Sequence, residues 1–188
     1  MKNILKKAAI VAFAASVSFV PVNAQEKGDF AVGGNVMLGY GNDIFEGGLG
    51  AKFLYNVSDP LRLAGEFDIL WGIGVKTEGG LGTLTTTTTW KEFSVYGHYL
   101  FQISTQKGNI AVYPLVGIGF VDLKTQVKLK VLNVTEKASA TESKFMFTLG
   151  GGIERAINEK FSSNVELRIK IVDEGIRLQM AYGITYKF

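Results

Sequence analysis

Hydrophobic and polar residues alternate along almost the whole chain from residue 30 onward. Alternation with a period of two is typical of strands whose two faces meet different surroundings, and helix start and stop signals are nearly absent. The pattern predicts an all-β fold with eight antiparallel strands, separated by turns or loops. The eight segments are 30–40, 45–57, 61–75, 91–103, 111–121, 145–157, 161–171 and 176–188.

The two faces of these segments differ in side-chain size. One face carries nearly all of the Phe, Trp, Ile and Val residues, and the other carries Gly, Ala, Ser and charges of both signs. Because an eight-stranded barrel is only just wide enough for side chains to fill it, the bulky face would overfill the interior. We therefore predict a closed, up-and-down transmembrane β-barrel with the bulky face toward lipid. The segment 111–121 is apolar on both faces, so its register is the least well specified.

Aromatic residues gather near the strand ends on the outward face, as expected where rings lie at the two membrane interfaces. Three connections beside the first belt are short (58–60, 105–109 and 158–160), whereas two beside the second are long (76–90 and 122–144). Short periplasmic turns and longer outer loops explain this asymmetry. The first belt comprises Phe30, Tyr55, Phe101, Phe161, Tyr186 and Phe188, and the second comprises Tyr40, Phe45, Trp71, Phe93, Phe120 and Phe145.

The N-terminus predicts an export signal. Lys2, Lys6 and Lys7 precede the uncharged stretch 8–20, and residues 22–24 (Val-Asn-Ala) suit a signal peptidase. A membrane anchor is the alternative, but the apolar stretch is short and polar residues follow at once. We expect residues 1–24 to be removed and residues 25–188 to form the barrel domain.

Removal of the signal changes the charge balance. The chain has 20 Lys+Arg and 17 Asp+Glu, and the signal holds three Lys and no acid, so 20 − 3 leaves 17 of each sign. A chain without net charge or basic clusters does not indicate a nucleic-acid partner. The absence of cysteine excludes disulfides, thiol catalysis and thiolate metal sites.

The last segment resembles the terminal signature of outer-membrane β-barrel proteins. Its matching positions are Tyr182, Ile184, Tyr186 and the final Phe188. The resemblance implies that the barrel-assembly machinery reads this strand. It also implies that the mature chain is similar to the small eight-stranded family that includes the OmpA membrane domain and OmpX, and that it lies in the bacterial outer membrane. That family is functionally mixed, so the resemblance does not fix an activity.

Charged side chains on the inward face are the main candidates for chemistry. Since buried charges need partners, we expect a network of salt bridges and hydrogen bonds that fills the lumen. A path or gate for ions is the alternative. The residues are Lys52, Arg62, Glu66, Asp68, Glu92, His98, Glu154, Glu166, Arg168, Lys170, Arg177 and Lys187.

His98 is the only histidine and is predicted to face inward in mid-strand. A lipid-modifying barrel enzyme would need a histidine beside a serine and an acid near the rim, and no serine adjoins His98. One histidine also disfavours a histidine-based metal site. We therefore predict no catalytic residue, no cofactor and no metal.

The two long outer loops differ in pattern. Residues 79–89 are rich in Gly and Thr but lack the Lys and helix of a phosphate-binding loop, so they predict a flexible, β-prone loop. In the second loop, Val127, Leu129 and Val131 alternate with Lys128 and Lys130. This predicts a hairpin that protrudes beyond the membrane, with an edge that can recruit a partner by strand addition.

Together these patterns predict a monomeric, non-enzymatic outer-membrane protein that contributes to membrane integrity or to external contacts. Its expected partners are outer-membrane lipid, the assembly machinery and an external partner of unknown identity. The alternatives are a narrow channel for ions or small solutes, a lipid-modifying barrel enzyme and a soluble lipocalin-like carrier.

Overall fold

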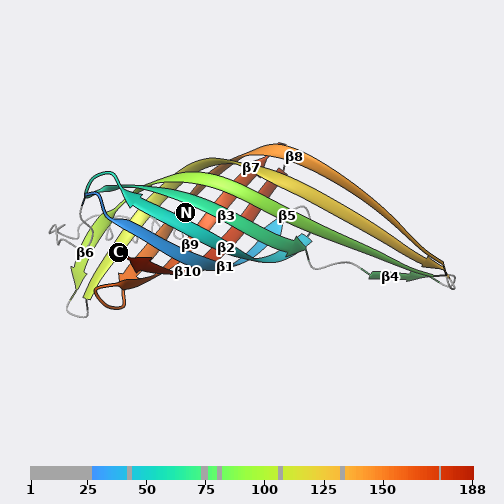
Figure 1. Ribbon diagram of the computed structural model, residues 1–188, viewed down its shortest axis with the longest axis horizontal. Coiled ribbons are helices and arrows are strands. Elements are labelled where there is room, and N and C mark those ends of the chain that lie inside the picture. Colours follow the sequence, from blue (N-terminus) through green and yellow to red (C-terminus); the bar gives the residue numbers. More distant parts are fainter. Residues whose placement is uncertain are drawn as a thin grey trace, which may run out of the picture.

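The computed structural model describes residues 27–41, 44–72, 76–79, 82–105, 108–131, 134–173 and 175–188, and its regular elements are β-strands (Figure 1). In these ranges, no helix has the length and apolar character needed to cross a membrane. The predicted signal peptide lies outside the described residues and stays a prediction. The strands are β1 (Phe30–Gly41), β2 (Ile44–Asn56), β3 (Leu61–Gly72), β4 (Lys76–Gly79), β5 (Gly82–Tyr99), β6 (Phe101–Thr105), β7 (Gly108–Val131), β8 (Val134–Ala156), β9 (Phe161–Val172) and β10 (Gly175–Lys187).

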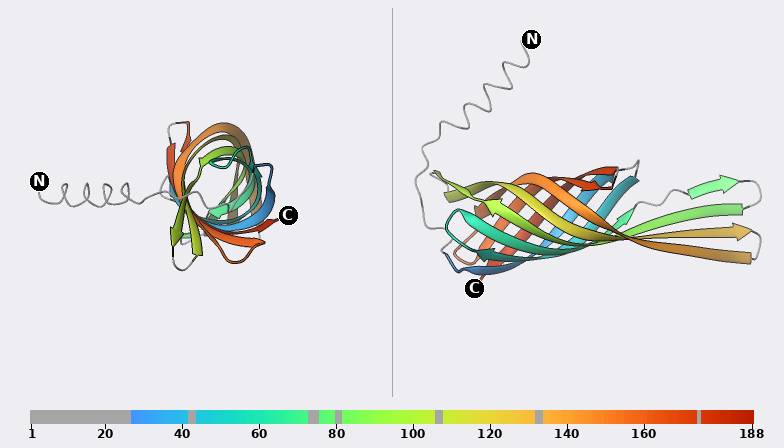
Figure 2. Two further views of the ribbon diagram at one scale, coloured as in Figure 1. Left: turned by 90° about the vertical axis from the view of Figure 1, so that its left-hand side faces the viewer. Right: turned by 90° about the horizontal axis from the view of Figure 1, so that it is seen from above.

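The strands close into a barrel, which the end-on view in Figure 2 shows as a ring. Each strand pairs antiparallel with its neighbours in the order β1-β2-β3-β5-β7-β8-β9-β10, and β1 pairs with β10 to complete the circuit. β6 continues β5 in the same register along β7. The break between them lies where Tyr99 comes opposite Pro114, which has no N–H to donate. The predicted eight-stranded, up-and-down barrel is therefore confirmed.

The strands are staggered around the barrel. Opposed residues lead from Ala31 through Leu54, Ala64, Tyr96, Gly117, Thr148, Lys170 and Arg177 back to β1 at Gly41 rather than at Ala31. Such a stagger tilts the strands relative to the barrel axis. Some side chains that meet inside the lumen oppose each other on neighbouring strands, as Lys52 and Glu66 do. Others, such as Arg168 and Glu66, come from opposite sides of the barrel.

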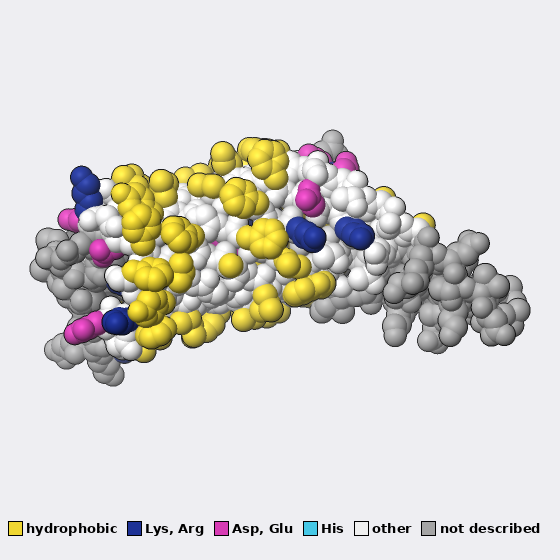
Figure 3. Space-filling model, in the orientation of Figure 1, with side chains coloured by type: hydrophobic (Ala, Val, Ile, Leu, Met, Phe, Trp, Pro, Cys, Tyr) yellow, Lys and Arg dark blue, Asp and Glu magenta, His cyan; other side chains and the backbone are white. Residues whose placement is uncertain are grey.

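Polarity is inverted relative to a water-soluble protein. On β9, Leu167 is 57% exposed, whereas its neighbour Arg168 is fully buried. Figure 3 shows the resulting band of hydrophobic side chains on the face of the barrel that it presents. The two-sided segment follows its predicted register, since Val116 and Ile118 point outward and Leu115 points inward.

Aromatic rings mark both edges of this band. Phe30 packs on Tyr55 with ring centroids 4.7 Å apart at the end of the barrel where β1 begins and β10 ends. Phe120 meets Phe145 at 5.7 Å at the other end. These pairs belong to the two predicted belts, and amphipathic rings favour the membrane interface.

Beyond the second belt, a sheet extends from the barrel on the side opposite the start of β1 and the end of β10 (Figures 1 and 2). We call it the arm, and it comprises β4 with residues 82–91, 121–131 and 134–144. The predicted hairpin is confirmed, because β7 and β8 stay paired to Val131 and Val134. β7 includes Val127, Leu129 and Val131, whose side chains lie outside those described.

The predicted loop at 79–89 was wrong, because β5 already begins at Gly82 and pairs with β7 from Thr83. Threonine is β-branched and fits a strand, and the extended β7 supplies a partner that the loop prediction lacked. The turns at the other end of the barrel are short, at 57–60 and 157–160. The arm therefore occupies the outer end, as the usual asymmetry of such barrels requires.

Candidate functional site

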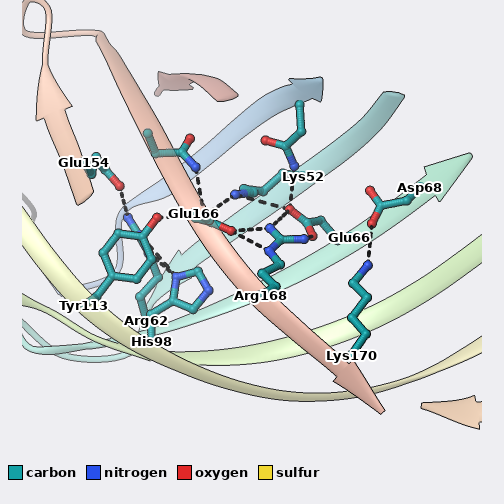
Figure 4. Close-up of polar contacts among 12 residues, drawn as sticks. Lys52, Arg62, Glu66, Asp68, His98, Tyr113, Glu154, Glu166, Arg168 and Lys170 are labelled. Atoms are coloured by element: carbon teal, nitrogen blue, oxygen red, sulfur yellow. Dashed lines mark hydrogen bonds and ion pairs between the residues drawn. The ribbon is translucent and has the colours of Figure 1, made fainter. Parts of the chain in front are cut away.

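The inward-facing charges are the candidate site, and Figure 4 shows most of them in contact. Every predicted lumen residue except Lys187 is at most 5% exposed. Lys187 is half-buried and lines a small pocket at the periplasmic end together with Arg62 and Glu154.

The central cluster joins strands from opposite sides of the barrel. Arg168 on β9 donates to both oxygens of Glu66 on β3, at 2.5 and 2.9 Å. Its Nε also donates to Glu166 at 2.8 Å. Lys52 on β2 pairs with Glu166 at 2.6 Å and with Glu66 at 3.2 Å. Two cations and two carboxylates thus share one buried network, in which each charge has opposite charges beside it.

Neutral side chains complete the central cluster. The Asn35 amide donates to Glu66 at 2.6 Å, and the Asn164 amide donates to Glu166 at 2.8 Å. The Tyr113 hydroxyl also donates to Glu166, at 2.7 Å. These bonds occupy carboxylate lone pairs that buried anions must satisfy. Alternation places all three donors on the inward face, but the predicted lumen network contained only charged residues and His98.

An outer cluster lies nearer the arm. Arg177 donates to Glu92 at 2.6 Å and to both oxygens of Glu46, each at 2.6 Å. Lys170 also hydrogen-bonds Glu92. The Arg177 guanidinium lies over the Trp90 ring, 5.1 Å from its centroid. Glu46 was not included in the predicted network, although alternation along the strand places it on the same face as Lys52. Trp90 was not included because it fell in the predicted loop 76–90.

A periplasmic cluster contains the single histidine. Arg62 pairs with Glu154 at 2.7 Å and donates from Nε to His98 Nδ1 at 3.2 Å. The His98 ring stacks on Tyr113, with centroids 4.8 Å apart and planes at 15°. His98 is therefore enclosed between a cation and an aromatic ring, as a packing residue would be.

Apolar side chains lie at both ends of the polar network. Toward the arm, Trp90 and Val121 pack with Met37, Leu70 and Ala181. Toward the periplasm, a second cluster comprises Ala31, Leu54, Ala64, Tyr96, Leu100, Tyr113 and Leu115. The central and outer clusters therefore lie between two groups of apolar side chains, whereas Arg62 and Glu154 line the periplasmic pocket.

The buried charges do not balance. Among the described residues, the charged side chains buried in the lumen are six carboxylates and five cations. Asp68 has the weakest contacts: neither of its oxygens accepts a hydrogen bond from the described residues, and Lys170 Nζ lies 3.7 Å from Oδ2. The six are Glu46, Glu66, Asp68, Glu92, Glu154 and Glu166, and the five are Lys52, Arg62, Arg168, Lys170 and Arg177.

No metal chemistry emerges from the described part of the chain, where no group of three or more His, Asp or Glu side chains is placed to hold an ion. The buried ion pairs instead have a mechanical and electrostatic role. They link the barrel walls, fill the lumen and leave the outer surface for contacts.

The sequence model described as "Outer membrane protein beta-barrel domain" matches residues 8–188. The chain belongs to this family. Members lie in the bacterial outer membrane, so the outward face of this barrel meets the bilayer, and the predicted location is confirmed. No curated protein gives a significant match.

Solved structures show the same fold at low identity. Ail, the attachment invasion locus protein of Yersinia pestis, is 18% identical with a TM-score of 0.54, covering 86% of this chain and 99% of Ail. The structure of Ail in complex with the heparin analogue sucrose octasulfate is 17% identical with a TM-score of 0.55. The match covers 86% of this chain and 99% of Ail. OprG of Pseudomonas aeruginosa is 14% identical with a TM-score of 0.45, covering 89% of this chain and 99% of OprG.

Proposed function

We propose that this protein is a non-conducting, non-enzymatic outer-membrane barrel that presents its arm to an external partner. The partner would add a strand to the free edge of β8. The observation that carries the proposal is the pairing of β8, which continues with β7 to Val134 but ends with β9 at Met146. Residues 134–145 therefore have one edge without a strand partner in the described part of the chain.

The geometry of the arm supports strand addition. An unpaired edge offers a row of N–H and C=O groups to another chain. At about 3.3 Å per residue, Val121–Val131 reaches about 35 Å beyond the belt. The described edge residues Ser139, Thr141 and Ser143 are exposed and polar, so the edge is soluble when unoccupied.

The filled lumen supports a non-conducting barrel. Arg177–Glu92 and Arg168–Glu66 each cross between strands that lie four positions apart around the barrel. The Trp90 cluster covers the outer end. The alternative of a narrow channel would require these contacts to separate, which leaves buried charges without partners.

The C-terminal signature supports recognition during assembly. Tyr182, Ile184 and Phe188 point outward and are 47–79% exposed. An assembly factor can therefore contact these side chains before lipid surrounds the barrel. Ail is named for attachment and invasion, and a contact role of that kind would fall to the arm here.

Planar-bilayer recording tests the lumen. The full chain should show no stable open state under conditions where a larger porin conducts. A steady unit conductance that persists in the Arg168→Lys variant would refute the non-conducting barrel and favour the channel.

Cell attachment tests the arm. Residues 124–141 would be replaced by Asn-Gly, which joins the paired residues Leu123 and Glu142 through a two-residue hairpin turn. Bacteria that display this variant should attach to an epithelial monolayer several-fold less than bacteria with the full chain, at equal surface levels. A control replaces only residues 132–133 by Asn-Gly and keeps the edge. Equal attachment of all three strains would rule out the arm.

A further inference from the structure

Two lysines stand directly beyond the outer aromatic belt. Phe93, Phe120 and Phe145 oppose one another across β5, β7 and β8 and are 52–60% exposed. The same register aligns the outward-facing residues further along these strands, in rows two residues apart. The next row is Lys91, Asp122 and Ser143, and the row after it is Thr89, Lys124 and Thr141.

Both lysines are available to an external anion. Lys91 and Lys124 are exposed, and neither pairs with a described carboxylate. Asp122 lies opposite Lys91, but its carboxylate accepts a hydrogen bond from Ser143 Oγ at 2.5 Å, on the β8 side. Positive side chains are visible just beyond the hydrophobic band on the arm side in Figure 3.

The two lysines are close enough to hold one anion together. They occupy a diagonal position on neighbouring strands, where Cβ atoms are about 7 Å apart. A lysine ammonium is a mobile point charge on a long stem, so both can reach one phosphate group. Thr89 and Thr141 flank Lys124 in register and add hydroxyl donors.

The height of the pair matches the headgroup layer. A bilayer is about 40–45 Å thick with a hydrocarbon core of about 30 Å, so each headgroup layer spans about 5–8 Å. Lys91 is two residues beyond Phe93, which is about 7 Å along the strand. Lysine stems lie along apolar surface and place the ammonium at this level.

We propose that Lys91 and Lys124, with Thr89 and Thr141, form a binding site for the phosphate groups of the outer-leaflet lipid. The site continues the lipid-facing surface of β5 and β7 past the aromatic belt. It uses outward side chains, and its two lysines lie on β5 and β7, whereas strand addition would use the backbone edge of β8. Only Thr141 belongs to both surfaces. Its role is to hold the arm against the headgroup layer.

Lipid A tests the site directly. The folded, detergent-solubilised full chain would be titrated with bisphosphorylated lipid A and with lipid A whose phosphates have been removed. Full-length protein should bind the phosphorylated form at least about tenfold more tightly than the dephosphorylated form, because each lysine near an anionic surface contributes to attraction. The Lys91→Gln/Lys124→Gln variant should lose this preference.

Matched controls separate this site from general attraction. Lys27 and Lys160 are exposed at the other end of the barrel, so Lys27→Gln/Lys160→Gln removes the same charge and should bind as the unaltered protein does. Equal binding of both lipid forms, or equal losses in the two double variants, would overturn the proposal. Binding of inorganic phosphate alone with the affinity of lipid A would also overturn it, since the source would then be free phosphate.

Discussion

Arg168 and Glu66 form a two-bond ion pair between strands on opposite walls of the barrel. β9 and β3 lie four positions apart in both directions around the ring, so the pair crosses the whole lumen. Side chains therefore connect the walls in addition to the backbone ladders. This arrangement makes the interior a structural element of the barrel, with consequences for its stability.

The first prediction compares two buried carboxylates. Glu66→Gln should reduce the free energy of unfolding by about 3 kcal/mol, because it removes a charged partner from Arg168 and Lys52 in a buried site. Asp68→Asn should change it by less than about 1 kcal/mol, since Asp68 accepts no hydrogen bond from the described residues. Urea unfolding in phospholipid vesicles measures both.

Either substitution brings the buried charges to five of each sign, so total charge cannot explain a difference between them. The comparison therefore isolates local pairing. Equal losses in the two variants would show that the network responds only to its net charge.

The second prediction concerns the lipid-facing surface. Leu167 is 57% exposed near the middle of β9, so Leu167→Arg should destabilise the barrel by about 2–4 kcal/mol. Ile157, 59% exposed beside the periplasmic turn, is the matched site, and Ile157→Arg should cost about 0–1 kcal/mol. If the two variants unfold at the same urea concentration, depth in the bilayer does not govern the cost.

The third prediction compares the inward Gly152 with the outward Gly65. A Cβ at Gly152 would lie 2.6 Å from Cζ of the Tyr113 ring, which holds its hydroxyl on Glu166. Gly152→Ala should therefore destabilise the barrel by about 1–3 kcal/mol through overpacking. A Cβ at Gly65 meets nothing within 4 Å, and Gly65→Ala should be neutral within about 0.5 kcal/mol. Unfolding of the two variants at the same denaturant concentration would argue against a packed lumen at Tyr113.

The fold was accessible from sequence because period and side-chain size act together. Alternation assigned Leu167 and Arg168 to different faces, and the width of an eight-stranded barrel then decided which face is inside. The extent of β5 was not accessible. Residues 82–90 become a strand because β7 lies beside them, and their own glycines and threonines allow loop and strand alike.

The members of the lumen network were accessible, but their pairings were not. Arg168 meets Glu66 rather than a residue on an adjacent strand because the stagger brings distant strands to one level. No single strand encodes that stagger, since it is a property of the closed circuit. Neutral donors such as Tyr113 were missed for a related reason. The sequence shows that a hydroxyl faces inward, but not which carboxylate lies within hydrogen-bonding distance of it.

The pairing of β1 with β10 sets an order of events. Val32 lies on the first strand of the circuit and its partner Tyr186 on the last, so the barrel can close only after β10 has been made. Until then, β1 carries an unsatisfied backbone edge and outward apolar side chains that water does not tolerate. The cell must therefore keep the exported chain unfolded and soluble between synthesis and insertion, until β10 can pair with β1.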